Sequence, residues 1–374
     1  MLLWLPRRLA IVLGTAVLLS AALSAQPGKP VSDRDPSVLA RLADDARVAL
    51  SVPGLSVAVG AGDVITWAQG FGVADLEQNV PVRPETVFRL ASISKPITAT
   101  AVMQLVERGL VSLEDPIQRF VPGFPRKSLG EVRIRHLLSH TSGIRHYRGD
   151  EFTINDYYPS LERAMAVFKD DPLLFAPGDQ YHYSTYGYNL LAGVVESVSA
   201  RSFDAHLRAN IFAPAGMSST LLERPQELVR YRARQYVRGP SPMTWLNAPY
   251  VDLSVKWAGG GLIATAGDLI RFDIALNAGR LLGQDTQDRM YTPTRLNSGA
   301  LTGYGLGWMI RQDAGRLKVA HSGGAAGGTT YLIREPRARL ASVVLANQDN
   351  VPRLGELADQ LMTLAPRPVS SSTR

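Results

Sequence analysis

The chain has no cysteine among its 374 residues. This excludes disulfide bonds, a thiol nucleophile and a lipid-modified cysteine. A strong charge excess is also lacking, because the formal net charge is only +7 and the charged residues are scattered. That balance argues against nucleic-acid binding and fits non-specific attraction to an anionic cell envelope better. No internal repeat is visible, and 45% apolar residues are enough for one large domain or two intertwined subdomains.

The N-terminal segment carries an uncharged apolar run, Leu9–Leu23, that follows two arginines and precedes small residues. The run is short for a permanent anchor, which needs about 20 apolar residues to cross a bilayer. We interpret residues 1–25 as a signal peptide that is cleaved near Ser24 or Ala25. The protein is therefore expected to be periplasmic or secreted. The alternative is an uncleaved membrane tether.

Hydrophobic periodicity predicts a sheet that is built from both ends of the chain. Residues 37–112 and 262–366 would form this sheet and its flanking helices, and residues 113–261 would be an inserted, mostly helical part. A flexible lead-in over 26–36 and a disordered tail over 367–374 would flank this domain. The predicted strands are 54–60, 64–72, 304–310, 316–323, 328–335 and 339–347, and the predicted helices include 37–50, 160–168, 188–200, 265–276 and 351–365.

A serine and a lysine stand three residues apart at the start of the helical run 88–109. Residues at i and i+3 share one helix face, so the Lys95 amine can reach the Ser92 hydroxyl. The positive end of the helix dipole disfavours an ammonium and favours a developing oxyanion. The pair can thus be reactive, but the pattern alone is also compatible with a helix cap beside a solvated lysine.

Four tyrosines, at 181, 183, 186 and 188, crowd the segment ahead of the predicted helix 188–200. A tyrosine beside a lysine ammonium can have its pKa lowered and can act as a general base. An ordinary aromatic packing cluster is the alternative.

A histidine followed by glycines occurs in residues 319–328, VAHSGGAAGG. Glycines at a strand edge allow a substrate to approach closely and let backbone N–H groups point at a carbonyl oxygen. The alternative is a flexible hairpin with an incidental histidine.

Taken in order, these motifs resemble those of the serine β-lactamase and penicillin-binding protein superfamily. The nearest group is the class C β-lactamase-like group, peptidase family S12. It includes family VIII esterases, D-Ala-D-Ala carboxypeptidases and the mitochondrial β-lactamase-like serine protease. The resemblance covers about residues 35–366 and rests on FRLASISKPITA, RIRHLLSHTSGIRHY, FAPGDQYHYSTYGYNLLAGVVE, WAGGGLIATAGDLIRF and HSGG.

The resemblance implies an α/β (α+β) fold of the β-lactamase/transpeptidase type, with an antiparallel sheet flanked by helices. It also implies catalytic roles. Ser92 would be the nucleophile of an acyl-enzyme, and Lys95 would accept or relay its proton. Tyr183 would be the general base that later returns a proton to the leaving group. The backbone N–H groups of Ser92 and Gly324 would form the oxyanion hole, and no metal or organic cofactor is implied.

Substrate-binding roles would fall on Thr185, His321, Ser322 and Gly323, where two departures from the family pattern occur. Tyr-x-Asn becomes Tyr183-Ser184-Thr185, and threonine lacks the amide that both donates and accepts. Lys-Thr-Gly becomes His-Ser-Gly, and a histidine is mostly neutral at pH 7, so it is a poorer clamp for a carboxylate. Because β-lactams and D-Ala-D-Ala both carry a carboxylate, we expect an esterase or a peptidase rather than an efficient β-lactamase.

The expected function is that of an exported serine hydrolase, peptidase- or D-Ala-D-Ala-carboxypeptidase-like, acting on small peptide, amide or ester substrates. Its substrates could be derived from the cell wall. Nucleic acid is not an expected partner. A membrane is expected as a partner only if the signal peptide stays uncleaved. A family VIII-type carboxylesterase or a weak class C-type β-lactamase is the alternative. A catalytically idle cell-wall binding protein is the non-enzyme alternative, against which the intact Ser92, Lys95 and Tyr183 argue.

Two other hydrolase classes fit less well. AHSGG imitates the nucleophile elbow of an α/β-hydrolase with Ser322 as nucleophile, but no histidine follows His321 and the region reads as strand-turn-strand. A zinc site at His136, His140 and His146 would lack the glutamate of H-E-x-x-H. These histidines are expected to stabilise a loop.

Overall fold

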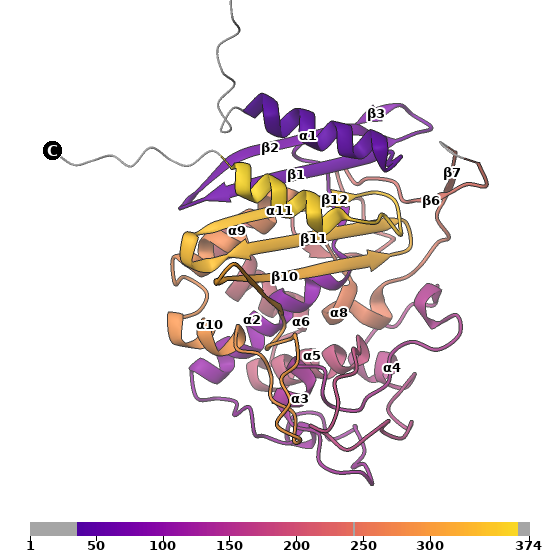
Figure 1. Ribbon diagram of the computed structural model, residues 1–374. Coiled ribbons are helices and arrows are strands. Elements are labelled where there is room, and N and C mark those ends of the chain that lie inside the picture. The colour runs from indigo at the N-terminus through magenta and orange to yellow at the C-terminus, as the bar shows by residue number, and fades with distance from the viewer. Residues whose placement is uncertain (1–35, 242–243, 366–374) are drawn as a thin grey trace, which may run out of the picture. The chain divides into compact units, whose positions relative to one another are not determined.

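The computed structural model describes residues 36–241 and 244–365 (Figure 1). The expected signal peptide, the lead-in up to residue 35 and the expected tail lie outside the described residues. The last residue of the expected lead-in, Pro36, is the first residue of a helix. Within the described ranges, no helix combines the length and the apolar character that a membrane crossing requires.

One antiparallel sheet of seven strands combines N-terminal strands with C-terminal strands, as the sequence predicts. Its order is β3-β2-β1-β12-β11-β10-β9. The N-terminal and C-terminal strands meet in the β1–β12 pair, in which Val57 lies opposite Val344. The strands are β1 Gly54–Ala61, β2 Val64–Asp75, β3 Val80–Pro81, β9 Met309–Asp313, β10 Arg316–Ala325, β11 Gly328–Glu335 and β12 Leu340–Ala346.

Helices cover both faces of this sheet, so β1 and β12 are buried along their whole length. Helices α1 (Pro36–Ala49) and α11 (Leu354–Leu364) pack on one face, and α9 (Ala266–Asn277) packs against β1, β2 and β12 on the other (Figure 1). Alternate residues of a strand point to opposite faces. Accordingly, Val57 joins the apolar cluster under α1 and α11, whereas Ala58 joins the larger cluster on the other face.

Helix α2 (Ser94–Glu107) packs against two helices of the inserted part, α5 (Tyr186–Ser199) and α8 (Trp257–Gly260). Because neighbours surround α2, twelve of its fourteen residues are buried. The remaining elements are short: α3 Ile134–Leu138, α4 Leu161–Met165, α6 Phe203–Leu207, α7 Ala213–Ala215, α10 Gln284–Met290, β4 Phe88–Arg89, β5 Leu221–Leu222, β6 Tyr236–Arg238, β7 Trp245–Asn247 and β8 Leu262–Ala264.

Several predicted boundaries differ from the structure. The helix predicted over 160–168 ends at Met165. The strand predicted over 304–310 begins only at Met309, because Gly307 has a left-handed backbone (φ +88°) that interrupts an extended run. Strand β10 does not end at Gly323, as predicted, but continues to Ala325, which places His321 in the middle of the strand.

Candidate active site

Ser92 lies in a single 3₁₀ turn, Ala91–Ile93, between β4 and α2, so the α-helix itself begins only at Ser94. Ala91 has a positive φ of 49°, an uncommon conformation for a residue with a side chain. Ala91 and Ile93 are buried, whereas Ser92 is partly exposed. The turn therefore leaves the Ser92 side chain accessible, while the residues on either side of it are held in the core.

Lys95 is completely buried and directed at Ser92. Its Nζ atom lies 3.0 Å from Ser92 Oγ, 3.1 Å from Thr185 Oγ1 and 2.6 Å from the carbonyl oxygen of Gly259. Burial, together with the positive charge of Lys256, holds the pKa of Lys95 well below its ordinary value. A neutral amine is thus favoured, and its lone pair can accept the proton of the Ser92 hydroxyl.

Tyr183 presents its hydroxyl to the same serine, with which it is hydrogen-bonded. Lys95 Nζ lies 4.7 Å from the centroid of the tyrosine ring. Burial raises the pKa of Tyr183 well above its ordinary value. This direction is opposite to the lowering expected from a neighbouring ammonium, because burial of the hydroxyl is the largest influence on its pKa. Tyr183 therefore keeps its proton and is suited to donate it.

The expected loop-stabilising role of the histidines is confirmed. His140 Nδ1 accepts the backbone N–H of Ser184 at 3.2 Å, and His146 Nδ1 accepts that of Thr185 at 3.3 Å. His136 Nδ1 accepts a backbone N–H at the start of α3. Among residues 36–241 and 244–365, no group of three or more His, Asp or Glu side chains could hold a metal ion. Two of the three histidines thus fix the backbone beside Tyr183.

Strand β10 reaches the turn that carries Ser92 because residue 323 is a glycine. A Cβ atom on Gly323 would lie only 2.5 Å from the carbonyl oxygen of Leu90 and 3.1 Å from Ala91 Cβ. Strand β9 pairs with β10 only over Arg316–Ala320, so β9 does not cover this edge beyond Ala320. Gly324 is exposed, and a Cβ atom there would meet nothing within 4 Å. This leaves room for a substrate carbonyl beside Gly324.

His321 is buried and cannot serve as a cation at neutral pH. Its Nδ1 lies 2.7 Å from the carbonyl oxygen of Ser322, which only accepts, so Nδ1 carries the proton. Its Nε2 lies 2.9 Å from the hydroxyl of Tyr304, from which it accepts. Burial and the neighbouring Lys95 lower the pKa of His321 to about 3. The expectation of a neutral histidine is confirmed, and Ser322 is the exposed member of this motif.

Thr185 lies behind Lys95 and is only 2% exposed. Its hydroxyl is engaged by Lys95 Nζ and by the hydroxyl of Tyr147. A substrate-binding role for Thr185 stays a prediction, and the geometry assigns its hydroxyl to holding Lys95. The sequence did not indicate that Tyr147, Gly259 and Tyr304 belong to the site, because only the fold brings them there.

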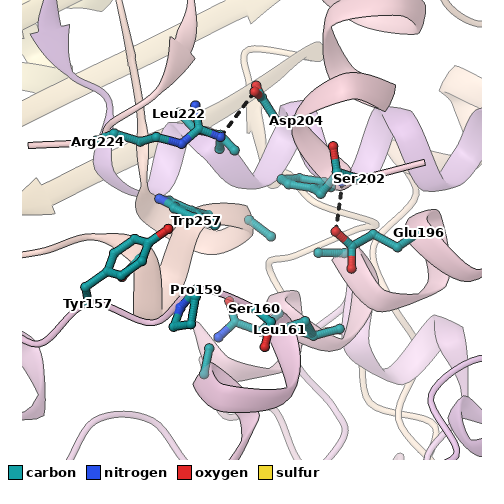
Figure 2. Close-up of a pocket in the computed structure, with 16 residues that line it drawn as sticks. Tyr157, Pro159, Ser160, Leu161, Glu196, Ser202, Asp204, Leu222, Arg224 and Trp257 are labelled. Atoms are coloured by element: carbon teal, nitrogen blue, oxygen red, sulfur yellow. Dashed lines mark hydrogen bonds and ion pairs between the residues drawn. The ribbon is translucent and has the colours of Figure 1, made fainter. Parts of the chain in front are cut away.

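A separate cavity of about 270 Å³ is shown in Figure 2. Trp257 and Ala258 of α8 line it, and an ion pair of 3.2 Å between Arg224 and Asp204 crosses one side. None of the predicted site residues lines this cavity. It is therefore not the place where the predicted reaction would occur.

A serine hydroxyl 3.0 Å from a buried lysine amine, in a turn beside a sheet that combines N-terminal and C-terminal strands, is the arrangement of serine hydrolases with the β-lactamase/transpeptidase-like fold. The family model described as Beta-lactamase matches residues 39–366. The chain belongs to the Beta-lactamase family.

Individual relatives agree with this assignment. The human mitochondrial serine beta-lactamase-like protein LACTB is 31% identical, over 82% of this chain and 72% of the human protein. Penicillin-binding protein 4* of Bacillus subtilis is 33% identical, over 79% of this chain and 68% of that protein. The octameric penicillin-binding protein homologue of Pyrococcus abyssi superimposes with a TM-score of 0.76 at 26% identity, covering 89% of this chain and 78% of the other. The protein is a serine hydrolase of this family.

Proposed function

We propose that the protein hydrolyses small peptide, amide or ester substrates through an acyl-enzyme on Ser92. The observation that carries the proposal is the 3.0 Å contact between Ser92 Oγ and the Nζ atom of Lys95, a lysine that burial shifts towards its neutral form. Such an amine can take a proton from the hydroxyl it contacts. We further propose that residues 37–366 act as one catalytic domain.

In the first half-reaction, the Ser92 proton passes to Lys95 as Oγ bonds to the substrate carbonyl carbon. The backbone N–H groups of Ser92 and Gly324 stabilise the negative charge that develops on the carbonyl oxygen. Tyr183 gives its proton to the departing amine or alcohol, and Lys95 then passes the proton that it took from Ser92 to Tyr183, which restores both groups. Water then attacks the ester of Ser92, and the same groups move the proton in reverse to release the acid.

The substrate preference follows from His321. A neutral imidazole whose two nitrogens are engaged by Tyr304 and the Ser322 carbonyl offers no positive charge to a substrate carboxylate. We therefore propose a serine peptidase, and a D-Ala-D-Ala carboxypeptidase-like activity would have to bind its substrate without such a clamp. A family VIII-type carboxylesterase or a weak class C-type β-lactamase is the second candidate, favoured by the exposed and unobstructed Gly324 edge.

We also propose that the protein is exported, with residues 1–25 as a cleaved signal peptide and with cell-wall peptides among its substrates. The relatives include bacterial penicillin-binding proteins as well as a mitochondrial protein, so this location rests on the sequence of the first 25 residues. The mass of the protein secreted from cells that express the full chain tests it. Retention of residue 1 would contradict cleavage.

The intact mass of the protein after incubation with a fluorescent penicillin, and separately with p-nitrophenyl acetate, tests the chemistry. Ser92→Ala is the matched variant, since it removes one oxygen from a partly exposed side chain. A penicilloyl adduct on the unmodified protein alone would indicate a penicillin-binding peptidase. Ester turnover that requires Ser92, without an adduct, would indicate an esterase or peptidase. Full turnover by folded Ser92→Ala would refute the proposal.

A further inference from the structure

A second buried lysine lies close to the first. Lys256 ends the 3₁₀ turn Ser254–Lys256, directly before α8, and is 5% exposed. Its Nζ atom donates to the carbonyl oxygen of Phe152 at 2.7 Å and lies 4.9 Å from the ring centroid of Tyr147. Within residues 36–241 and 244–365, it forms no ion pair with a carboxylate. A buried cation without an anionic partner costs free energy, and such groups concentrate at functional sites.

Two connections join Lys256 to Lys95. The first runs through side chains, because the Tyr147 ring under Lys256 carries a hydroxyl that is hydrogen-bonded to Thr185, and Thr185 Oγ1 is 3.1 Å from Lys95 Nζ. The second runs along the backbone, because Gly259, three residues after Lys256, provides the carbonyl oxygen 2.6 Å from Lys95 Nζ. Both lysines therefore belong to one buried network.

We propose that Lys256 is a positioning residue whose positive charge keeps Lys95 deprotonated, and hence ready to accept the Ser92 proton, at mildly acidic pH. This inference rests on the proposed role of Lys95. A like charge nearby disfavours a second ammonium. After burial, the positive charge of Lys256 is the next cause of the lowered pKa of Lys95.

The groups around Lys256 leave its charge uncompensated. Arg89 of β4 lowers its pKa further, and burial and Arg89 together bring that pKa to about 7. His146 has its own pKa lowered to about 4, in part by Lys95 and Lys256, so it is neutral. Burial raises the pKa of Tyr147, which therefore stays protonated. None of these groups supplies a negative charge.

The carboxylates on the neighbouring segments have other partners. Asp252 accepts the backbone N–H of Ser254 at 2.8 Å. Glu151 forms an ion pair of 2.6 Å with Arg145 and accepts the hydroxyl of Tyr186 from α5. Helix α4, which also packs against residues 254–256, contributes the exposed Glu162 and Arg163.

The sign of the effect follows from these groups. Below about pH 7, Lys256 is charged, and its charge then opposes the protonation of Lys95. Above that pH, Lys256 loses its charge and no longer acts on Lys95. Lys256 thus extends the activity towards lower pH and has little effect in alkaline solution.

The test compares kcat/KM for p-nitrophenyl acetate between pH 5 and 9 in the unmodified protein and in Lys256→Met, with Ser92→Ala as the blank. We expect the acidic limb of the Lys256→Met profile to move up by about one pH unit, so that activity at pH 6 falls about tenfold. Activity at pH 9 should stay within about twofold of the unmodified protein. Lys256→Arg, which keeps the charge, should have the same acidic limb as the unmodified protein.

Lys318→Met is the matched control, because Lys318 is also a buried lysine but is paired with Asp313 at 2.8 Å and Asp359 at 2.6 Å. It should lower Tm without moving the pH profile. If Lys256→Met does not fold, Lys256→Gln removes the charge and retains a donor for the Phe152 carbonyl. An unmoved acidic limb, or an equal loss at every pH, would overturn the inference while Ser92-dependent turnover remained. Turnover by Ser92→Ala would instead refute the proposed function.

Discussion

The ring of Tyr183 lies against the imidazole of His140, with their centroids 4.2 Å apart and their planes 38° from parallel. The imidazole of His146 meets the same tyrosine ring edge-on at 5.6 Å. Both histidines also accept backbone N–H groups from the residues that follow Tyr183. The orientation of the tyrosine is therefore set by packing and by its backbone, and its hydroxyl is left to Ser92.

Tyr183→Phe should consequently keep the fold and lose catalysis. The ring contacts remain, so Tm should stay within about 2 °C of the unmodified protein. The loss of the proton donor should lower kcat on an amide substrate by about 10²- to 10⁴-fold. An activated ester should be less affected, because p-nitrophenolate leaves without protonation. Equal losses on amide and ester would contradict the assignment of Tyr183 as the donor to the leaving group.

Much of the fold could be predicted because it depends on patterns that are local in sequence. Strand β1 follows from the alternation around Val57, and the start of α9 follows from Thr265, whose hydroxyl accepts the N–H of Asp268 at 3.0 Å. The start of α2 could not be predicted, since the 3₁₀ turn before it depends on the contact of Gly323 with Leu90 and Ala91. Those contacts join residues far apart in sequence.

The sequence motifs predicted which residues would come together at the candidate site, but they did not predict the electrostatics there. Ser92, Lys95 and Tyr183 converge as the motifs suggested. The direction of the Tyr183 pKa could not be read from the sequence, because it depends on burial of the hydroxyl rather than on which residues are neighbours. Lys256 was missed for the same reason, since only the fold brings it near Lys95.

His321→Lys should improve the handling of carboxylate-bearing substrates. The side chain would exchange a neutral imidazole for an ammonium that can pair with the carboxylate of a β-lactam. A charge-assisted hydrogen bond contributes about 1.5 to 3 kcal/mol, so kcat/KM on a cephalosporin should rise about tenfold or more. Hydrolysis of p-nitrophenyl acetate, which has no carboxylate, is the control and should not rise. An unchanged cephalosporin rate would count against this account of position 321.

Stability should fall in acid because of His321. Its pKa is about 3 in the folded protein and about 6.5 when unfolded, so the unfolded state binds more protons between these values and stability decreases as pH falls through that window. At about pH 4.5 this single group should cost about 2 to 3 kcal/mol relative to pH 7. Urea unfolding at both pH values measures the loss.

His321→Gln should show a smaller loss between the two pH values than the unmodified protein. His182→Gln is the control, because His182 is exposed, and it should leave the loss unchanged. The same pH dependence in all three proteins would show that His321 is not the group responsible.

Gly323 and Gly324 are adjacent in β10, yet their substitution by alanine should have different effects. The added methyl group at 323 would collide with the hydroxyl of Thr330 and lie 2.5 Å from the carbonyl oxygen of Leu90, so β10 must move away from the turn that carries Ser92. We expect Gly323→Ala to destabilise the protein by about 1 to 3 kcal/mol and to lower kcat at least tenfold.

The same methyl group at 324 would have no atom within 4 Å, and neither residue has a positive φ. Gly324→Ala should therefore unfold at the same urea concentration as the unmodified protein and keep its backbone N–H at the edge of the strand. The rate at which p-nitrophenyl acetate acylates Ser92 should be measured for both variants. A slow rate in Gly323→Ala that is still folded would indicate displacement of β10 rather than a general loss of stability. If Gly323→Ala acylated as fast as Gly324→Ala, the close approach of β10 to Ser92 would not be needed for the reaction.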